Sequence, residues 1–550
     1  MLKLLGVVAL TVLSLTPRNA PAQTLTPTEV AAWREDVRTL GTELPRRHKN
    51  AFAHMTREQW DAAVKRIDTR LPRLKRHEVI VEIMRLAALV RDGHTALNPD
   101  FEDRTGFHRL PIRLYDFSDG LIIIAADSAH KDLVGARVVR VGRATAAAAL
   151  DSAAQIISHE GANWVRWRAP GMLTIPEVTA ALRLSDDPSQ TTFTVEQSGR
   201  ERTVVIAAAG TAAGGGHGPV TPNEFVDMRN VTPGEDPLWL QQPRRLFWFT
   251  ILPDKTLYIN HRAVQFIDGG VLNEVFFRRA FAAGDSVGVE RVVIDMRVNG
   301  GGNNFLNRFL VKELIRRPQL DRADRLFVLI GRGVFSAAQN LVNELDFYTN
   351  ATFVGEPTGN SPNQYGDARP LELPNSKLRV FISSLYWQGH VAADERTWFT
   401  PDVFVEATSA DYRAKRDPVL ERALKHASEP PLSQRLTPDA ERGDTAAVSR
   451  AVEAFRDAPE NRYHDVEGDV NGAGYQLLNG RRHAAAIVVF VVNTRLFPQS
   501  ANTFDSLAEA YERAGQRDAA IAAYRRALAM DPEMGSSREG LRRLGAAPPN

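Results

Sequence analysis

No cysteine occurs among the 550 residues of the chain. Its absence excludes disulfides, a thiol nucleophile, thiolate metal sites and a lipid anchor on an N-terminal cysteine. An excess of charge of one sign is also missing, because 68 basic and 66 acidic residues leave a formal net charge of +2. This balance gives no reason to expect nucleic acid or an anionic surface as a partner.

Apolar runs of transmembrane length are likewise lacking, and the first residues have a different pattern. Lys3 precedes a short apolar stretch at 4–15, and Ala20-Pro21-Ala22 offers small residues for cleavage. This order is typical of a secretory signal peptide, so we expect residues 1–22 to be removed and the mature protein to be exported, periplasmic or extracellular. The alternative, a retained membrane anchor, needs a longer apolar run.

The length of the chain predicts several domains, because one hydrophobic core stops growing at roughly 250–300 residues. Apolar residues at helical spacing predict an N-terminal helical region at 23–110. Short alternating strands follow at 111–210 and predict a small β-rich insert. Within it, residues 133–142 resemble the strand-turn-strand of a PDZ domain, with the rest of that pattern incomplete.

The region 239–425 predicts an α/β domain. Its strands are nearly continuous apolar runs, at 256–260, 291–295, 326–330, 352–354 and 380–383. Helical patterns lie between several of them, for instance at 271–282 and 305–316. Buried strands that alternate with helices indicate a mainly parallel sheet covered on its faces, with functional groups at the carboxyl ends of the strands.

The last part of the chain, 440–550, predicts helical repeats after a polar linker at 426–438. Its glycine, aromatic and proline landmarks at 480, 490 and 498 recur at 515, 524 and 532, about 34 residues later. This period fits tetratricopeptide-like helix pairs, which bind peptides or partner proteins. The equal alternative is a helical cap that only packs on the α/β domain.

Ser336 stands where the strand at 326–330 turns, through two glycines, into a helix. A hydroxyl on such a turn is presented beside the free amides of the first helical turn, as a nucleophile requires. The alternative is a helix N-cap, a position that serine also favours. The local pattern leaves both hypotheses open.

Three further stretches bear on this serine. Gly93 is expected to end a helix, which puts His94 just past its C-terminus, where the helix dipole favours the charged form; a surface or structural histidine is the alternative. Gly300-Gly301-Gly302 follows a buried strand and is either a plain turn or a loop whose amides bind an oxyanion. A phosphate loop is not indicated, because no Gly-Lys-Ser/Thr follows. Glu395 and Asp394 are carboxylates that either orient a histidine or lie in solvent.

Taken together, five short motifs resemble the tail-specific or C-terminal-processing serine protease family and its tricorn core protease branch. They are Asp92-Gly93-His94-Thr95, Asp295-Met296-Arg297-Val298-Asn299-Gly300-Gly301, Phe335-Ser336-Ala337-Ala338, Val354-Gly355-Glu356-Pro357-Thr358-Gly359 and Thr400-Pro401-Asp402-Val403. The likeness covers roughly residues 27–425. It implies a serine peptidase on a crotonase-like α/β core, with peptide or unfolded protein as substrate and no cofactor or metal.

The resemblance also implies roles for individual residues. Ser336 matches the nucleophile, and the amide of Gly300 or Gly301, with that of Ala337, matches the oxyanion hole. The lysine of the Ser-Lys branch is missing, because Gly359 is followed by Asn360 and Ser361. The tricorn branch uses instead a histidine and a glutamate, which correspond here to His94 and Glu395, with Asp394 as the neighbouring candidate.

Two other functions stay open at this stage. The first is a non-catalytic protein that keeps the fold and binds peptides or small apolar ligands, since a fold alone does not establish hydrolysis. The second is a hydrolase for a non-peptide ester or amide. Contact between His94 and Ser336 would favour an enzyme.

Overall fold

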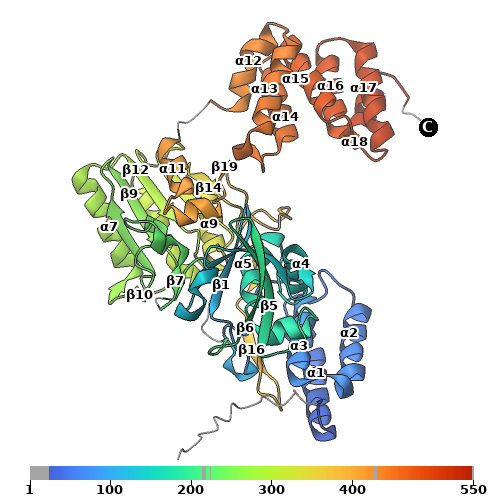
Figure 1. The fold of residues 1–550 in the computed structure, drawn as a ribbon. Coiled ribbons are helices and arrows are strands. Elements are labelled where there is room, and N and C mark those ends of the chain that lie inside the picture. Colours follow the sequence, from blue (N-terminus) through green and yellow to red (C-terminus); the bar gives the residue numbers. More distant parts are fainter. Residues whose placement is uncertain (1–23, 213–217, 223, 427–429, 548–550) are drawn as a thin grey trace, which may run out of the picture.

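The structure is a computed structural model, and it describes residues 24–212, 218–222, 224–426 and 430–547 (Figure 1). The signal peptide predicted at 1–22 lies outside these residues. Within them, every helix is too short or too polar to cross a bilayer. The described chain forms an α/β fold, as the sequence predicted, with helical regions at both ends.

Three helices form the N-terminal region, α1 (Pro27–Arg47), α2 (Arg57–Arg70) and α3 (Arg76–Ala88). A capping box between Thr26 and Glu29 starts α1. The expectation that Gly93 ends the third helix is wrong. The helix ends at Ala88, and Arg91 has a left-handed φ of 57°. Gly93 is therefore not a helix end, and it packs instead against Phe335 and Glu160.

The region predicted as a β-rich insert folds around an antiparallel sheet. Its strand order is β1-β2-β3-β5-β6, and β4 and β7 pair with β3 and β2. The strands are β1 (Ile112–Phe117), β2 (Gly120–Ala126), β3 (Arg137–Val141), β4 (Ala144–Thr145), β5 (Gln190–Gln197), β6 (Arg200–Ala207) and β7 (Val226–Asp227). Three helices separate β4 from β5, namely α4 (Ala146–Ala154), α5 (Ala162–Met172) and α6 (Pro176–Ala181). The segment thus contributes helices as well as strands.

A six-stranded sheet is the centre of the second compact region, with the order β19-β14-β13-β12-β9-β8. All neighbours are parallel except the edge pair β8 and β9. The strands are β8 (Phe247–Ile251), β9 (Thr256–His261), β12 (Arg291–Asp295), β13 (Leu326–Ile330), β14 (Thr352–Gly355) and β19 (Val403–Phe404). The near-continuous apolar runs therefore do form a mainly parallel sheet.

Helices cover both faces of this sheet. On one face lie α7 (Asn273–Val287), α8 (Asn307–Ile315) and α9 (Ala337–Tyr348), which pack with the sheet in one buried cluster. On the other face α11 (Pro418–Lys425) packs against Phe327 and Leu329. The expected strand at 380–383 belongs elsewhere, because β17 (Arg379–Ile382) pairs antiparallel with β16 (Arg369–Glu372) outside this sheet.

The last helices run from α12 to α18 and gather as a group beyond the α/β region (Figure 1). They are α12 (Leu432–Glu441), α13 (Thr445–Asp457), α14 (Val466–Asn479), α15 (His483–Leu496), α16 (Ala501–Arg513), α17 (Arg517–Met530) and α18 (Gly535–Arg543). The linker is shorter than the predicted 426–438, because Pro438 lies inside α12. The glycine landmarks 480 and 515 each follow one helix and precede the next, so the repeat in sequence is a repeat of helix pairs.

Candidate active site

Ser336 occupies a strained turn between β13 and α9. Its φ is 58° and its ψ is −127°, a left-handed conformation that is uncommon for a residue with a side chain. Although it holds the N-cap position, its side chain makes no capping hydrogen bond. The N-cap alternative therefore does not describe this serine. A strained serine on a strand-to-helix turn is the arrangement of a nucleophile elbow.

Two side chains hold the backbone of Ser336 in this conformation. The Oδ1 atom of Asn360 accepts a hydrogen bond from the Ser336 N–H at 2.8 Å, and Nε2 of Gln364 donates to the Ser336 carbonyl at 3.1 Å. Asn360 thus contacts the serine from the position at which the Ser-Lys branch has its lysine. In the described part of the chain the Ser336 hydroxyl has no hydrogen-bond partner, so the backbone of this serine is held while its hydroxyl stays unengaged.

The glycine loop at 300–302 lies against this turn. A Cβ atom on Gly301, whose φ is 96°, would come within 2.7 Å of the Ser336 Cβ and 2.9 Å of the Ala337 nitrogen. The Gly301 N–H donates to Asn299 Oδ1 at 2.9 Å. The N–H groups of Gly300 and Ala337 donate no hydrogen bond to any described residue. Of the two glycines that the sequence left open, Gly300 has the unengaged amide.

His94 faces the same space from the N-terminal region. Its ring lies 4.4 Å from the Phe335 ring, centroid to centroid, and the Trp164 ring stacks on Phe335 as well, at 4.0 Å. Both ring nitrogens are buried and have no hydrogen-bond partner in the described chain. Burial lowers the pKa of His94, although the charges of Asp92 and Asp367 act in the opposite direction. The histidine is therefore held in its neutral, basic form, contrary to the helix-dipole expectation.

Gly93 allows this close packing. A Cβ atom at this position would lie 2.8 Å from the Phe335 ring and 2.9 Å from a carboxylate oxygen of Glu160. Real Cβ atoms do not approach other atoms so closely, because van der Waals repulsion is steep at such distances. Glycine is therefore required next to His94 so that the loop can reach the serine.

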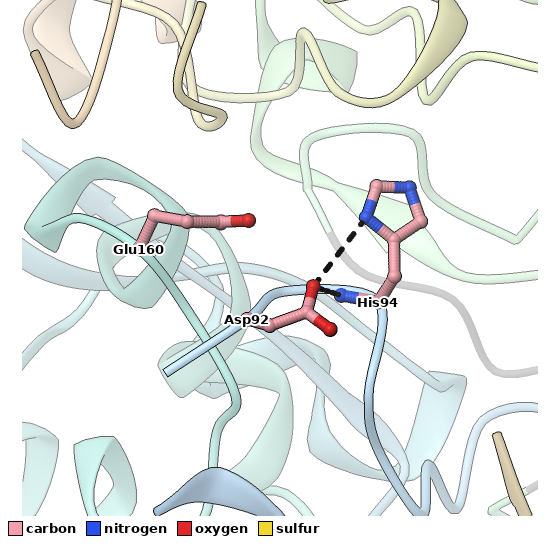
Figure 2. A group of neighbouring side chains, drawn as sticks. All are labelled: Asp92, His94 and Glu160. Carbon is pink, nitrogen blue, oxygen red and sulfur yellow. Dashed lines mark hydrogen bonds and ion pairs between the residues drawn. The ribbon is translucent and has the colours of Figure 1, made fainter. Parts of the chain in front are cut away.

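Asp92 and Glu160 are two carboxylates close to His94 (Figure 2). One side-chain nitrogen or oxygen atom from each of the three residues lies within 4.8 Å of the others. Oδ1 of Asp92 accepts a hydrogen bond from the His94 backbone N–H at 2.9 Å and lies 3.9 Å from its Nδ1 atom. Burial opposes ionisation of Asp92, but hydrogen bonds, the largest from His48, give the carboxyl a lowered pKa. Burial, reinforced by the charge of Asp92, raises the pKa of Glu160 to about 8.

Sequence reasoning gave neither carboxylate a role. Asp92 belongs to the quoted motif around His94, so its position two residues before the histidine was an available signal. Glu160 lies 66 residues after His94, in the loop between α4 and α5, and reaches the site because this loop packs against Gly93. No local pattern marks it.

Glu395 and Asp394 are not brought to His94 in this conformation. The Glu395 side chain is exposed and forms no hydrogen bond or ion pair with any residue that the structure describes. Asp394 is paired with Nη2 of Arg396 at 2.7 Å and with Nδ1 of His390 at 2.8 Å. The structure therefore joins Ser336, Ala337, the glycine loop and His94, and leaves the predicted acid apart.

Two cavities meet at Ser336 and His94. One, of about 360 Å³, is mainly apolar and includes Trp164, Ile157 and Met172 in its lining. The other, of about 420 Å³, is more polar and also contacts Asn340 and Gln364. Ser336 and His94 line both cavities. A chain-like ligand that crosses from one cavity to the other would therefore pass over the serine.

No family model matches the sequence, and a search of curated proteins finds no match either. Solved structures do match the fold. Mature CPAF is similar over 72% of this chain and 96% of its own, with 14% sequence identity and a TM-score of 0.50. This likeness shows a shared fold.

Two further solved structures are similar at lower TM-scores. The photosystem II D1 C-terminal processing protease covers 69% of this chain and 94% of its own, with 15% identity and a TM-score of 0.33. For the tricorn protease the shares are 72% and 36%, with 12% identity and a TM-score of 0.33.

Proposed function

We propose that this chain, which has structural neighbours among C-terminal processing and tricorn proteases, is a serine peptidase with Ser336 as its nucleophile. One observation carries the proposal. An unbonded serine hydroxyl on a strained strand-to-helix turn shares two cavities with a buried, unbonded histidine. Nucleophile and base need such proximity, and their hydrogen bond is often loose until substrate binds.

The proposed reaction begins when His94 takes the proton of the Ser336 hydroxyl and the serine oxygen attacks the peptide carbonyl. The negative charge that develops on the carbonyl oxygen is stabilised by the amides of Ala337 and of Gly300 or Gly301. His94 then gives its proton to the leaving amine, and water hydrolyses the acyl-enzyme by the same steps in reverse. Gly301 can take part only if its N–H leaves Asn299.

The acid of the triad has two candidates. We propose Glu395 in the catalytic state, as the resemblance implies, which requires the exposed turn around it to close over His94. Asp92 is the alternative, because its carboxylate already lies 3.9 Å from Nδ1 of His94. A carboxylate in either place would orient the imidazole and stabilise its charged form.

We further propose that the peptidase is exported, acts on peptides or unfolded proteins in the periplasm or outside the cell, and has a crotonase-like core. The terminal helix pairs, as tetratricopeptide-like repeats, would bind a protein partner. The nearly balanced charge, +2 overall, gives no reason to expect nucleic acid as a partner.

Hydrolysis of a mixed peptide library, followed by mass spectrometry, tests the proposal. Wild-type protein should cut peptide bonds, and Ser336→Ala and His94→Ala should each reduce the rate by at least about 10³-fold. Glu395→Gln and Asp92→Asn show which carboxylate orients His94. Substitution of the orienting carboxylate should lower kcat strongly without changing the melting temperature, and substitution of the other should not lower kcat strongly. A wild-type protein that binds peptides and cleaves none would favour the non-catalytic binding protein instead.

A further inference from the structure

Asp92, His94 and Glu160 form a compact cluster of one nitrogen and two oxygen donors. One ligand atom from each residue lies within 4.8 Å of the others. Figure 2 shows the Glu160 side chain arriving from a different segment of the chain, so that donors 66 residues apart meet at one point. Zn²⁺ takes nitrogen and oxygen ligands at about 2.0–2.2 Å. Small side-chain movements would bring all three donors to that distance.

The donors that face this point lack partners. Both carboxylate oxygens of Glu160 and both ring nitrogens of His94 are shielded from solvent and complete no hydrogen bond of ordinary geometry within the described residues. The Gly93 N–H and the Asn360 side chain lie close enough to the Glu160 carboxylate to oppose the rise of its pKa. A buried carboxylate and a buried imidazole that complete no ordinary hydrogen bond are unusual side by side, because such groups are otherwise nearly always satisfied. Asp92 differs, since Nε2 of His48 and Oγ1 of Thr95 contact its Oδ2 atom, which fixes Oδ1 toward the cluster.

We infer that Asp92, His94 and Glu160 bind one divalent transition-metal ion, with Zn²⁺ as the best fit. Three protein ligands with a fourth position open to solvent or substrate are typical of zinc sites outside closed structural ones. The imidazole makes Ca²⁺ and Mg²⁺ poor candidates, because both prefer oxygen ligands, and the chain has no thiolate to select a softer metal. The cavities that His94 lines give an ion a path to the cluster.

Metal binding at this site would inhibit the proposed hydrolysis by Ser336. A neutral imidazole has a single lone pair, so an ion on Nδ1 of His94 leaves the proton on Nε2, and the ring can no longer accept the proton of Ser336. The ion also occupies the side where Asp92 would orient the ring. The inhibitory consequence depends on the proposed function, whereas the binding itself does not. We therefore expect Zn²⁺ to act as a reversible inhibitor that a chelator removes.

Calorimetric titration of the metal-stripped full-length chain with Zn²⁺ tests the site. The expected result is one ion per chain, with an affinity at least tenfold weaker in Glu160→Gln. The matched control is Glu177→Gln, the same exchange at a glutamate that contacts His108 at 2.6 Å, which should leave the affinity unchanged. Equal affinities for wild type and Glu160→Gln would overturn the inference.

A second measurement needs no variant. Co²⁺ added to the wild-type chain should give a visible absorption band of a low-coordinate N,O site, and Zn²⁺ should displace it in a 1:1 ratio. No such band would overturn the inference. The two proposals fail separately: binding without hydrolysis would refute the peptidase alone, and hydrolysis without binding would refute the metal site alone.

Discussion

At the scale of single residues, the backbone of Ser336 is held by neighbouring side chains and its hydroxyl is not, as the proposed role of a nucleophile requires. The N–H and C=O groups are both held by side chains, from Asn360 and Gln364, while the hydroxyl is free. The strain of a positive φ is tolerated because these contacts and the neighbouring glycine loop leave no other conformation. His94 is similar, because its backbone N–H donates to Asp92 while its ring makes no hydrogen bond to a described residue and packs on Phe335.

Gly301→Ala tests how closely the glycine loop must approach the serine. The new methyl group would meet Phe335 O at 2.6 Å and the Ser336 Cβ at 2.7 Å, at a positive φ. We expect a loss of about 2–4 kcal/mol in the free energy of unfolding and a loss of serine labelling. Chemical denaturation and an active-site probe measure the two effects.

Gly300→Ala is the matched control for this substitution. A Cβ atom at Gly300 meets nothing within 4 Å, and the amide that could bind the oxyanion is kept. Stability should therefore change by less than about 1 kcal/mol, and labelling should persist. Equal losses of stability and of labelling in Gly301→Ala and Gly300→Ala would contradict a special role for the close contact between Gly301 and Ser336.

At the scale of elements, sequence patterns predicted strands best where strands are buried on both faces. Residues 291–295 and 326–330 are strands with those bounds, because central parallel strands are apolar throughout. The strand near 380 was predicted but assigned to the wrong sheet, since an apolar run does not say which strand it pairs with. Gly93 was predicted from its local pattern to end a helix. Its close packing against Phe335 and Glu160 is the actual reason why a glycine is needed there.

The candidate site was also predicted only in part, because local motifs mark some of its residues and contacts between distant segments bring in the others. Motifs that resemble a known family indicated Ser336, His94 and the glycine loop, and the structure places them together. Glu160 and the stack of Trp164 on Phe335 arise from contacts between segments far apart in sequence, which no local pattern encodes. The role of Glu395 stays a prediction, because it depends on a turn that lies open here.

The contact of the terminal helices with β19 should depend on pH. His464, just before α14, is hydrogen-bonded to Asp469 and to the Asp402 carbonyl, and these contacts raise its pKa. A raised pKa in the folded state means that stabilisation is present in full below the unfolded value near 6.5 and is lost as pH rises through the folded value.

We therefore expect the wild-type protein to have a higher melting temperature than His464→Gln at pH 5.5. This difference should vanish at alkaline pH. Thermal unfolding followed by circular dichroism at both pH values checks this. A difference that grows with pH would refute the assigned sign.

At the scale of the whole molecule, the site is independent of the terminal helices. Ser336, His94 and their neighbours are packed by two cores that contain no residue beyond the α/β region. The terminal helices have their own buried clusters. Between the two parts, the ring of Tyr463 lies 5.1 Å from that of Phe404, beside the His464 contact. The helices are thus attached at one edge of the sheet.

A chain that ends at residue 426 should accordingly keep its reactive serine. We expect probe labelling within about twofold of the full-length rate, since no residue of the cavities is removed. The same truncation carrying Ser336→Ala is the control for background labelling. A folded truncated chain that fails to label would mean that the terminal helices complete the site.

The most direct test of the central claim is covalent labelling by a fluorophosphonate probe, with the modified residue located by peptide mass spectrometry. The account predicts one adduct per chain, on Ser336, absent from Ser336→Ala and strongly slowed in His94→Ala. Equal labelling of wild type and Ser336→Ala, or an adduct on any other serine, would contradict it.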